Sequence, residues 1–246
     1  MKKNLFLIWL VLVLLAISIG LYIVFSLIFG NMRATNENLA SAAIFLPIQL
    51  IIVVVIVDRL IENRDKQIKL DKLNVVAGVF FSELGERMLT SFNCAARDRD
   101  RLFRALGIKA SWTLKEFKAA DAFSKGISNE INVHQVDLEA IKVLLQENRP
   151  FLVLLLENPT LLEHDGFTDM VLSILHLADE LIARNSLNNL PKNDINHIEV
   201  DINRAYSSTV AEWLEYMRHI KSDYPFLYSL YVRIHPFQEN PSAIIS

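Results

Sequence analysis

Cysteine is nearly absent from the chain, and its scarcity excludes several classes of site. Cys94 is the only cysteine among 246 residues. A single thiol forms no intramolecular disulfide and no cysteine-based zinc site, and it indicates a reducing compartment. The seven glycines are scattered singly, so the sequence has neither a Gly-x-Gly-x-x-Gly fingerprint nor a Walker-type phosphate loop. A Gly-x-Ser-x-Gly nucleophile elbow is also absent.

Charged side chains are missing from two long stretches near the N-terminus. None occurs within 4–32, and none within 38–57. A helix needs about 20 mostly apolar residues to cross a bilayer, so the sequence predicts two transmembrane spans, at 5–29 and 39–57. A cleaved signal peptide is the alternative for the first stretch, but its apolar core would be only about 7–15 residues long.

The distribution of basic residues sets the predicted orientation. Lys2 and Lys3 precede the first span and several basic residues follow the second, whereas the connecting loop has only Arg33. The positive-inside rule then places both termini in the cytoplasm. The sequence therefore predicts a two-helix transmembrane hairpin in the cell inner (plasma) membrane, with the lipid bilayer as a partner.

Four residues of the predicted spans are candidates for helix–helix or pore contacts. Ala16 and Gly20 form a small-x-x-x-small pair, which permits close approach of helices. Pro47 removes a backbone donor and predicts a kink. Gln49 is the one strongly polar side chain deep in either span, and either a helix–helix hydrogen bond or a pore contact would satisfy it. Assembly into a homo-oligomer and packing within one hairpin both stay open.

The residues that follow the second stretch are rich in charge and have helical periodicity, which predicts an all-α class with a cytosolic helical bundle. The expected domains are the hairpin at 1–57, a juxtamembrane helical stem at 58–92, the bundle at 93–235 and a loose tail at 236–246. The net charge of −3 does not suit neutralisation of phosphates, so no nucleic-acid partner is expected.

Capping residues and prolines predict helix boundaries within the bundle. The run 113–116, Thr-Leu-Lys-Glu, matches a capping box, and Asp137 and Asp194 are expected to cap two further helices. Pro150 is expected to open a short, buried helix of its own, over 151–156. Trp213 lies at the centre of the apolar stripe on the helix after Asp194, so we expect it to belong to the core.

Histidine and carboxylate pairs raise a metal hypothesis, which the sequence does not favour. His176 with Glu180, and His197 with Asp201, are each four residues apart, so each pair shares one helix face. These faces are polar and lie away from the apolar stripes, so we expect them to point to water. Neither Glu-x-x-His nor His-Glu-x-x-His occurs. The sequence therefore predicts no metal ligand, no cofactor and no catalytic residue, and the chain is predicted not to be an enzyme.

Several stretches resemble a group of uncharacterised prokaryotic proteins with two membrane helices and a cytosolic helical domain. They are 57–62 (Val-Asp-Arg-Leu-Ile-Glu), 72–74 (Lys-Leu-Asn), 80–85 (Phe-Phe-Ser-Glu-Leu-Gly), 213–217 (Trp-Leu-Glu-Tyr-Met) and 224–227 (Tyr-Pro-Phe-Leu). The resemblance implies a membrane protein, and it transfers no catalytic or binding residue.

These observations favour a membrane-anchored, non-enzymatic interaction or regulatory module, whose bundle binds an unknown cytosolic protein. Two alternatives stay open. One is an oligomeric channel or membrane-perturbing effector, in which Gln49 would line the assembly. The other is an enzyme with an unrecognised helical active site, which would need a cleft with convergent, buried titratable groups.

Overall fold

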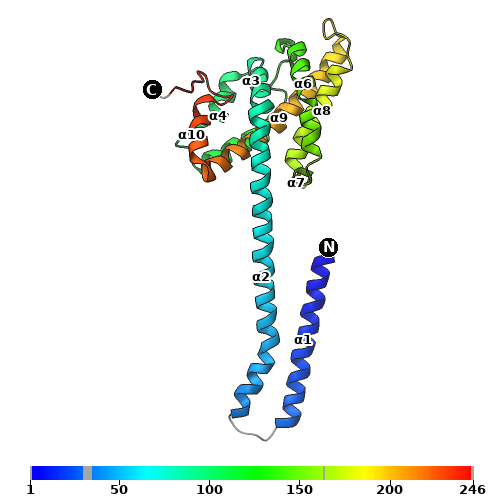
Figure 1. Ribbon diagram of the computed structural model, residues 1–246, viewed down its shortest axis with the longest axis vertical. Coiled ribbons are helices and arrows are strands. Elements are labelled where there is room, and N and C mark those ends of the chain that lie inside the picture. Colours follow the sequence, from blue (N-terminus) through cyan, green and yellow to red (C-terminus); the bar gives the residue numbers. More distant parts are fainter. Residues whose placement is uncertain (1, 30–34, 163, 245–246) are drawn as a thin grey trace. The chain divides into compact units, whose positions relative to one another are not determined.

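The computed structural model describes residues 2–29, 35–162 and 164–244, and in those ranges it consists of helices joined by loops (Figure 1). Within them the β structure is limited to an isolated antiparallel bridge between Ala96 and Ile131. The predicted all-α class is therefore confirmed for the part of the chain that the structure describes.

The chain divides into two compact units, Met1–Ile68 and Lys69–Ser246. The first unit contains α1 (Lys2–Phe29) and most of α2 (Thr35–Phe80). Leu, Ile, Val and Phe dominate α1, and many of its described side chains are exposed. The boundary between the units falls inside α2, so the residues predicted as a stem belong to both.

Over the described residues, no helix offers an apolar stretch long enough to cross a bilayer. This finding contradicts the predicted transmembrane hairpin with spans at 5–29 and 39–57. The predicted inner-membrane localisation, with both termini in the cytoplasm, is contradicted with it.

Each predicted span also includes residues whose side chains the structure does not describe. The side chains of 2–8 and 35–44, which the predicted spans also need, lie outside the described residues. So does the connecting segment 30–34, on which the predicted orientation depended.

The second unit begins on α2, which continues without a break into a π-helix, Phe81–Gly85, and then α3, Glu86–Cys94. Five turns of α-helix advance about 18 residues, but the buried stripe from Leu73 to Phe92 advances one residue further in five turns. The wider π turn absorbs the additional residue and keeps the stripe on one face. Members of this stripe are Leu73, Ala77, Phe80, Phe81, Leu84, Met88 and Phe92.

The remaining helices complete a bundle around one apolar core. They are α4 (Arg99–Leu106), α5 (Leu114–Ser124), a 3-10 turn (Val133–Gln135), α6 (Leu138–Leu156), α7 (Pro159–Leu162), α8 (Asp165–Ile182), α9 (Lys192–Asp223) and α10 (Pro225–Ile234). The helix α8 packs against both α6 and α9. The indole of Trp213 on α9 is fully buried, which confirms its predicted place in the core.

Two of the three predicted helix caps are confirmed. The side chains of Thr113 and Glu116 form the reciprocal capping box at the start of α5, and Asp137 caps α6 by accepting a hydrogen bond from the Ala140 N–H at 2.9 Å. The prediction for Asp194 is wrong, because α9 already begins at Lys192 without a side-chain cap. The carboxylate of Asp194 is instead bound by Arg184, which follows the end of α8.

Pro150 does not open a new helix. It lies inside α6, which runs unbroken from Leu138 to Leu156. The predicted short, buried helix over 151–156 is therefore wrong. Only one face of this segment packs into the core, since Leu155 is buried and the adjacent Leu154 is exposed. Packing on this one side is enough to keep α6 continuous at Pro150, although proline has no backbone N–H to donate to the preceding turn.

The predicted loose tail at 236–246 is packed at its beginning. Phe237 is buried, and its ring centroid lies 4.9 Å from that of Trp213. The carbonyl oxygen of Pro236 accepts a hydrogen bond from Asn93 Nδ2 at 2.9 Å. The chain after α10 thus closes over the core before it leaves the bundle.

Candidate metal centre

Two polar stripes, one on α8 and one on α9, meet along an edge of the interface between these helices. The connection from α8 to α9 is short, and the two helices run antiparallel, as shown by the pairs at either end of the contact. Ser173 Oγ lies 3.0 Å from Ser208 Oγ, and Arg184 Nη2 lies 2.5 Å from Asp194 Oδ1. Side chains that share a helix face at intervals of one turn are therefore brought opposite each other in reverse order.

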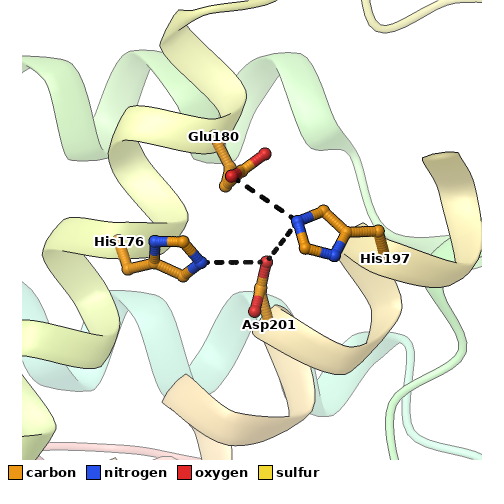
Figure 2. Close-up of side chains that lie close together, drawn as sticks. All are labelled: His176, Glu180, His197 and Asp201. Carbon is orange, nitrogen blue, oxygen red and sulfur yellow. Dashed lines mark ion pairs between the residues drawn. The ribbon is translucent and has the colours of Figure 1, made fainter.

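Between these end pairs lie two histidines and two carboxylates (Figure 2). His176 Nε2 is 3.5 Å from Asp201 Oδ2, and His197 Nε2 is 3.4 Å from the same oxygen. His197 Nε2 is also 3.5 Å from Glu180 Oε1. The four potential ligand atoms all lie within 4.8 Å of one another. Each helix thus supplies a histidine and, one turn later, a carboxylate.

The cluster has a buried base and an open side. Asp201 is 1% exposed, and its Oδ2 atom is buried without a hydrogen-bond partner. The side chains of His176 and His197 remain 47% and 50% exposed. A carboxylate oxygen that has lost its water needs a cation or a donor in compensation. The imidazoles supply the nearest such groups, from the solvent side.

The other oxygen of each carboxylate is held by an arginine. Asp201 Oδ1 accepts a hydrogen bond from Arg204 Nη1 at 2.9 Å, and Glu180 Oε2 accepts one from Arg184 Nη1 at 2.8 Å. The hydrogen bond from Arg184 lowers the pKa of the Glu180 carboxyl below its ordinary value. Outer partners of this kind orient metal ligands and keep carboxylates ionised.

Arg184 is itself fixed by a third carboxylate. Its Nε and Nη2 atoms donate to the two oxygens of Asp194, at 2.9 and 2.5 Å. This bidentate pair raises the pKa of Arg184 and lowers that of Asp194. Glu180 is therefore presented to the cluster by a guanidinium that cannot turn away without breaking the pair with Asp194.

The spacing of the donor atoms suits a tetrahedral ion. Zinc binds imidazole nitrogen and carboxylate oxygen at about 2.0–2.2 Å, so neighbouring donors around it lie about 3.3–3.6 Å apart. The three separations of 3.4–3.5 Å in the cluster fall in that interval. Two imidazoles with two carboxylates form a donor set that first-row divalent ions accept. The other donor pairs, which lie within 4.8 Å of one another, would have to move slightly closer to bind the same ion.

A second group of potential ligands, Asp71, His219 and Asp223, is less suited to an ion. Both aspartates are exposed, so water already compensates their charge. His219 Nδ1 lies 2.9 Å from Asp223 Oδ2, the length of an ordinary hydrogen bond. The first cluster differs from this group through the buried, unpartnered oxygen of Asp201.

The residues predicted as helix–helix or pore contacts lie elsewhere, in the first unit. Ala16, Gly20 and Gln49 are exposed, and a Cβ built on Gly20 would have no atom within 4 Å. The side chain of Pro47 lies outside the described residues. Their proposed role in contacts stays a prediction.

The sequence identified the His176–Glu180 and His197–Asp201 pairs but did not predict that the two pairs lie close together. Both stripes were expected to point to water, whereas the structure turns them towards each other. The signal was present in the sequence, because the two pairs sit at matching distances on either side of the connection between the helices. In an antiparallel hairpin this symmetry places each histidine opposite the carboxylate of the other pair.

Comparisons with known proteins match both units. Residues 69–233 match the family model described as "Uncharacterized protein MJ1433, C-terminal helical domain", and residues 2–61 match "MJ1433, N-terminal helical domain". The uncharacterized protein MJ1433 of Methanocaldococcus jannaschii is 38% identical over 232 residues, which cover 94% of this chain and 93% of that protein. No solved structure matches.

Proposed function

This chain belongs to the MJ1433 family of helical proteins, and we propose that it binds one divalent transition-metal ion between α8 and α9. The ligands would be His176, Glu180, His197 and Asp201, and zinc is the ion that their spacing suits best. The expected kinship with uncharacterised helical proteins is confirmed by the family matches, whereas its membrane component is not supported.

The observation that carries the proposal is the Oδ2 atom of Asp201. It is buried, it has no hydrogen-bond partner, and two imidazole nitrogens face it at 3.4 and 3.5 Å. A divalent ion among these atoms would compensate the buried charge and would use both carboxylate oxygens left free by the arginines. The competing interpretation is an ion-pair network, in which protonated imidazoles alone compensate Asp201.

Such an ion would act as a clamp. It would join the C-terminal half of α8 to the N-terminal half of α9 and would stabilise their pairing by mass action, by about 2.7 kcal/mol at a free concentration 100 times the dissociation constant. An ion that stabilises a helix pair in this way has a structural role, which is consistent with a non-enzymatic interaction or regulatory module. We therefore retain that role as the proposal for this protein.

The test is titration of the chelator-treated, full-length protein with zinc and with cobalt(II). We expect one ion per chain, and we expect cobalt(II) to give the intense visible absorption of tetrahedral coordination. His176→Gln and His197→Gln should each abolish high-affinity binding. His219→Gln reports on the second group, and His134→Gln, at an exposed position of the 3-10 turn, is the matched control.

Two results would overturn the proposal. One is the absence of stoichiometric binding by the unaltered protein. The other is equal binding by the His176→Gln and His134→Gln variants. Loss of binding in His219→Gln alone would assign the ion to the second group and contradict the site proposed here.

A further inference from the structure

A hollow beside α9 adjoins the candidate metal centre. Its volume is about 490 Å³, within the range of about 300–1,000 Å³ that is usual for small-molecule sites. One wall is the turn 127–129, and the other is formed by residues of α9 between 196 and 207. Arg204 lines this hollow and also donates to Asp201 Oδ1 at 2.9 Å. The two sites therefore share one guanidinium.

The walls of the hollow are held in place by buried hydrogen bonds. The side-chain amide of Asn203 accepts from the Ile131 N–H at 2.9 Å and donates to the Ile131 carbonyl at 3.2 Å. The same amide donates to the carbonyl of Glu199 at 2.8 Å. Asn129 adopts φ 58°, a left-handed conformation that asparagine tolerates well. The hollow is thus preformed, which limits the ordering cost of binding.

The lining combines polar groups with two apolar side chains, Ile127 and Val200. Asn129, Asn196 and Ser207 present amide and hydroxyl groups, and the exposed Val200 offers a surface for carbon atoms. Among the described side chains, the amides of Asn129 and Asn196 have no hydrogen-bond partner. These groups would satisfy the hydroxyls of a polar ligand.

Glu199 and Arg204 both line the hollow, and each is already paired with a group of opposite charge. Glu199 Oε1 is paired with Arg97 Nη2 at 2.5 Å. Arg204 keeps a side chain that is 56% exposed and uses one nitrogen on Asp201. Its remaining N–H groups can bind an oxyanion, because a guanidinium offers donors in a planar fork that matches carboxylate and phosphate.

We propose that this hollow binds a small hydroxylated molecule with one oxyanion group, either carboxylate or phosphate. The oxyanion lies on Arg204, and the hydroxyls lie against the amides of Asn129 and Asn196. This site goes beyond the metal-binding function and does not require it, although Arg204 places the ligand next to the ion.

The experiment is calorimetric titration of the full-length protein, both chelator-treated and zinc-loaded, with three probes. Glycerol 3-phosphate and glycerate carry the two oxyanions, and glycerol carries none. We expect saturable binding of at least one anionic probe and none of glycerol. The preference between phosphate and carboxylate identifies the source of the oxyanion.

Variants locate the binding. Arg204→Gln should weaken it by about tenfold or more, since a charged hydrogen bond is lost, and Asn196→Ala should weaken it several-fold. Arg218→Gln is the matched control, because Arg218 also lies on α9 and also pairs with a carboxylate three residues earlier, at Glu215. Asn196 is not among the four proposed metal ligands, so its variant should still bind zinc.

The proposal is overturned if neither anionic probe binds in either metal state. Equal binding by the Arg204→Gln and Arg218→Gln variants would overturn it too. Zinc content is measured on the same samples, so failure of the metal site and failure of this hollow give different results.

Discussion

Glu212 should make the folded protein less stable as the pH rises through the neutral range. This residue continues the polar stripe of α9 beyond Ser208 and lies against Gly166 at the start of α8. Burial raises the pKa of its carboxyl from 4.5 to about 7. The folded state therefore keeps the proton in a pH interval where the unfolded chain has released it.

The sign and size of the effect follow from this difference. Between about pH 4.5 and pH 7 the folded state binds more protons than the unfolded state, so the free energy of unfolding falls as the pH rises. Above about pH 7 both states are ionised and the loss is complete. A difference of about 2.5 pKa units corresponds to about 3 kcal/mol.

The substitution Glu212→Gln removes the ionisable group and keeps the shape of the side chain. We expect the variant to gain about 3 kcal/mol relative to the unaltered protein between pH 4 and pH 8, measured by urea unfolding at several pH values. Glu147→Gln, at an exposed position of α6, is the control and should leave the pH dependence unchanged. A Glu212→Gln curve that runs parallel to that of the unaltered protein would refute the reasoning.

Three further substitutions test the packing of the second unit. Trp213→Ala should lower the free energy of unfolding by about 3–5 kcal/mol, because the indole is fully buried; a loss below about 1 kcal/mol in urea unfolding would contradict that. Gly166→Ala should change the free energy of unfolding by less than about 1 kcal/mol, since a Cβ there would meet only Glu212 Oε1, the far end of a flexible side chain; a loss above about 2 kcal/mol in urea unfolding would show that Glu212 is held rigidly. Asn203→Ala should cost about 1–3 kcal/mol by leaving the buried Ile131 N–H unpaired, and hydrogen exchange at Ile131 should accelerate; unchanged exchange would argue against the bond.

Local sequence signals predicted the helices of the second unit well where the deciding interactions are themselves local. The capping box at Thr113 and Glu116 and the cap at Asp137 each join residues within one turn, and both are present in the structure. Trp213 was placed in the core by periodicity alone, and it is there. The two caps have their physical cause within a few residues, and Trp213 follows from the periodicity of the apolar stripe along its own helix.

The failures come from partners distant in sequence. Asp194 has the right residue type for a helix cap, but Arg184, which follows the end of α8, binds its carboxylate. Pro150 has the right type for a helix start, but packing on one face of α6 carries the helix through it. The helix propensity of a residue is a weak preference, and tertiary contacts override it at both positions.

The candidate metal centre shows the same limit. Periodicity predicts that the polar faces with His176 and with His197 point to solvent, because each lies away from the apolar stripe of its own helix. A face at the margin of an interface is neither core nor open surface, however, and periodicity does not distinguish it from either. Only the antiparallel pairing of α8 with α9 brings His176 opposite Asp201 and Glu180 opposite His197.

The π-helix at Phe81–Gly85 determines which side chains of the preceding turns of α2 face the core. Each residue of an α-helix turns the chain by about 100°, so deletion of one residue, such as Ser82, would restore regular α-helix and rotate the preceding turns by about that angle. Leu73 and Ala77, now buried, would then leave the core, and the exposed Val75 and Val79 would move towards it. The bundle therefore requires this segment to keep its length, because a change of length would rotate the preceding turns relative to the core and would not simply shorten the helix.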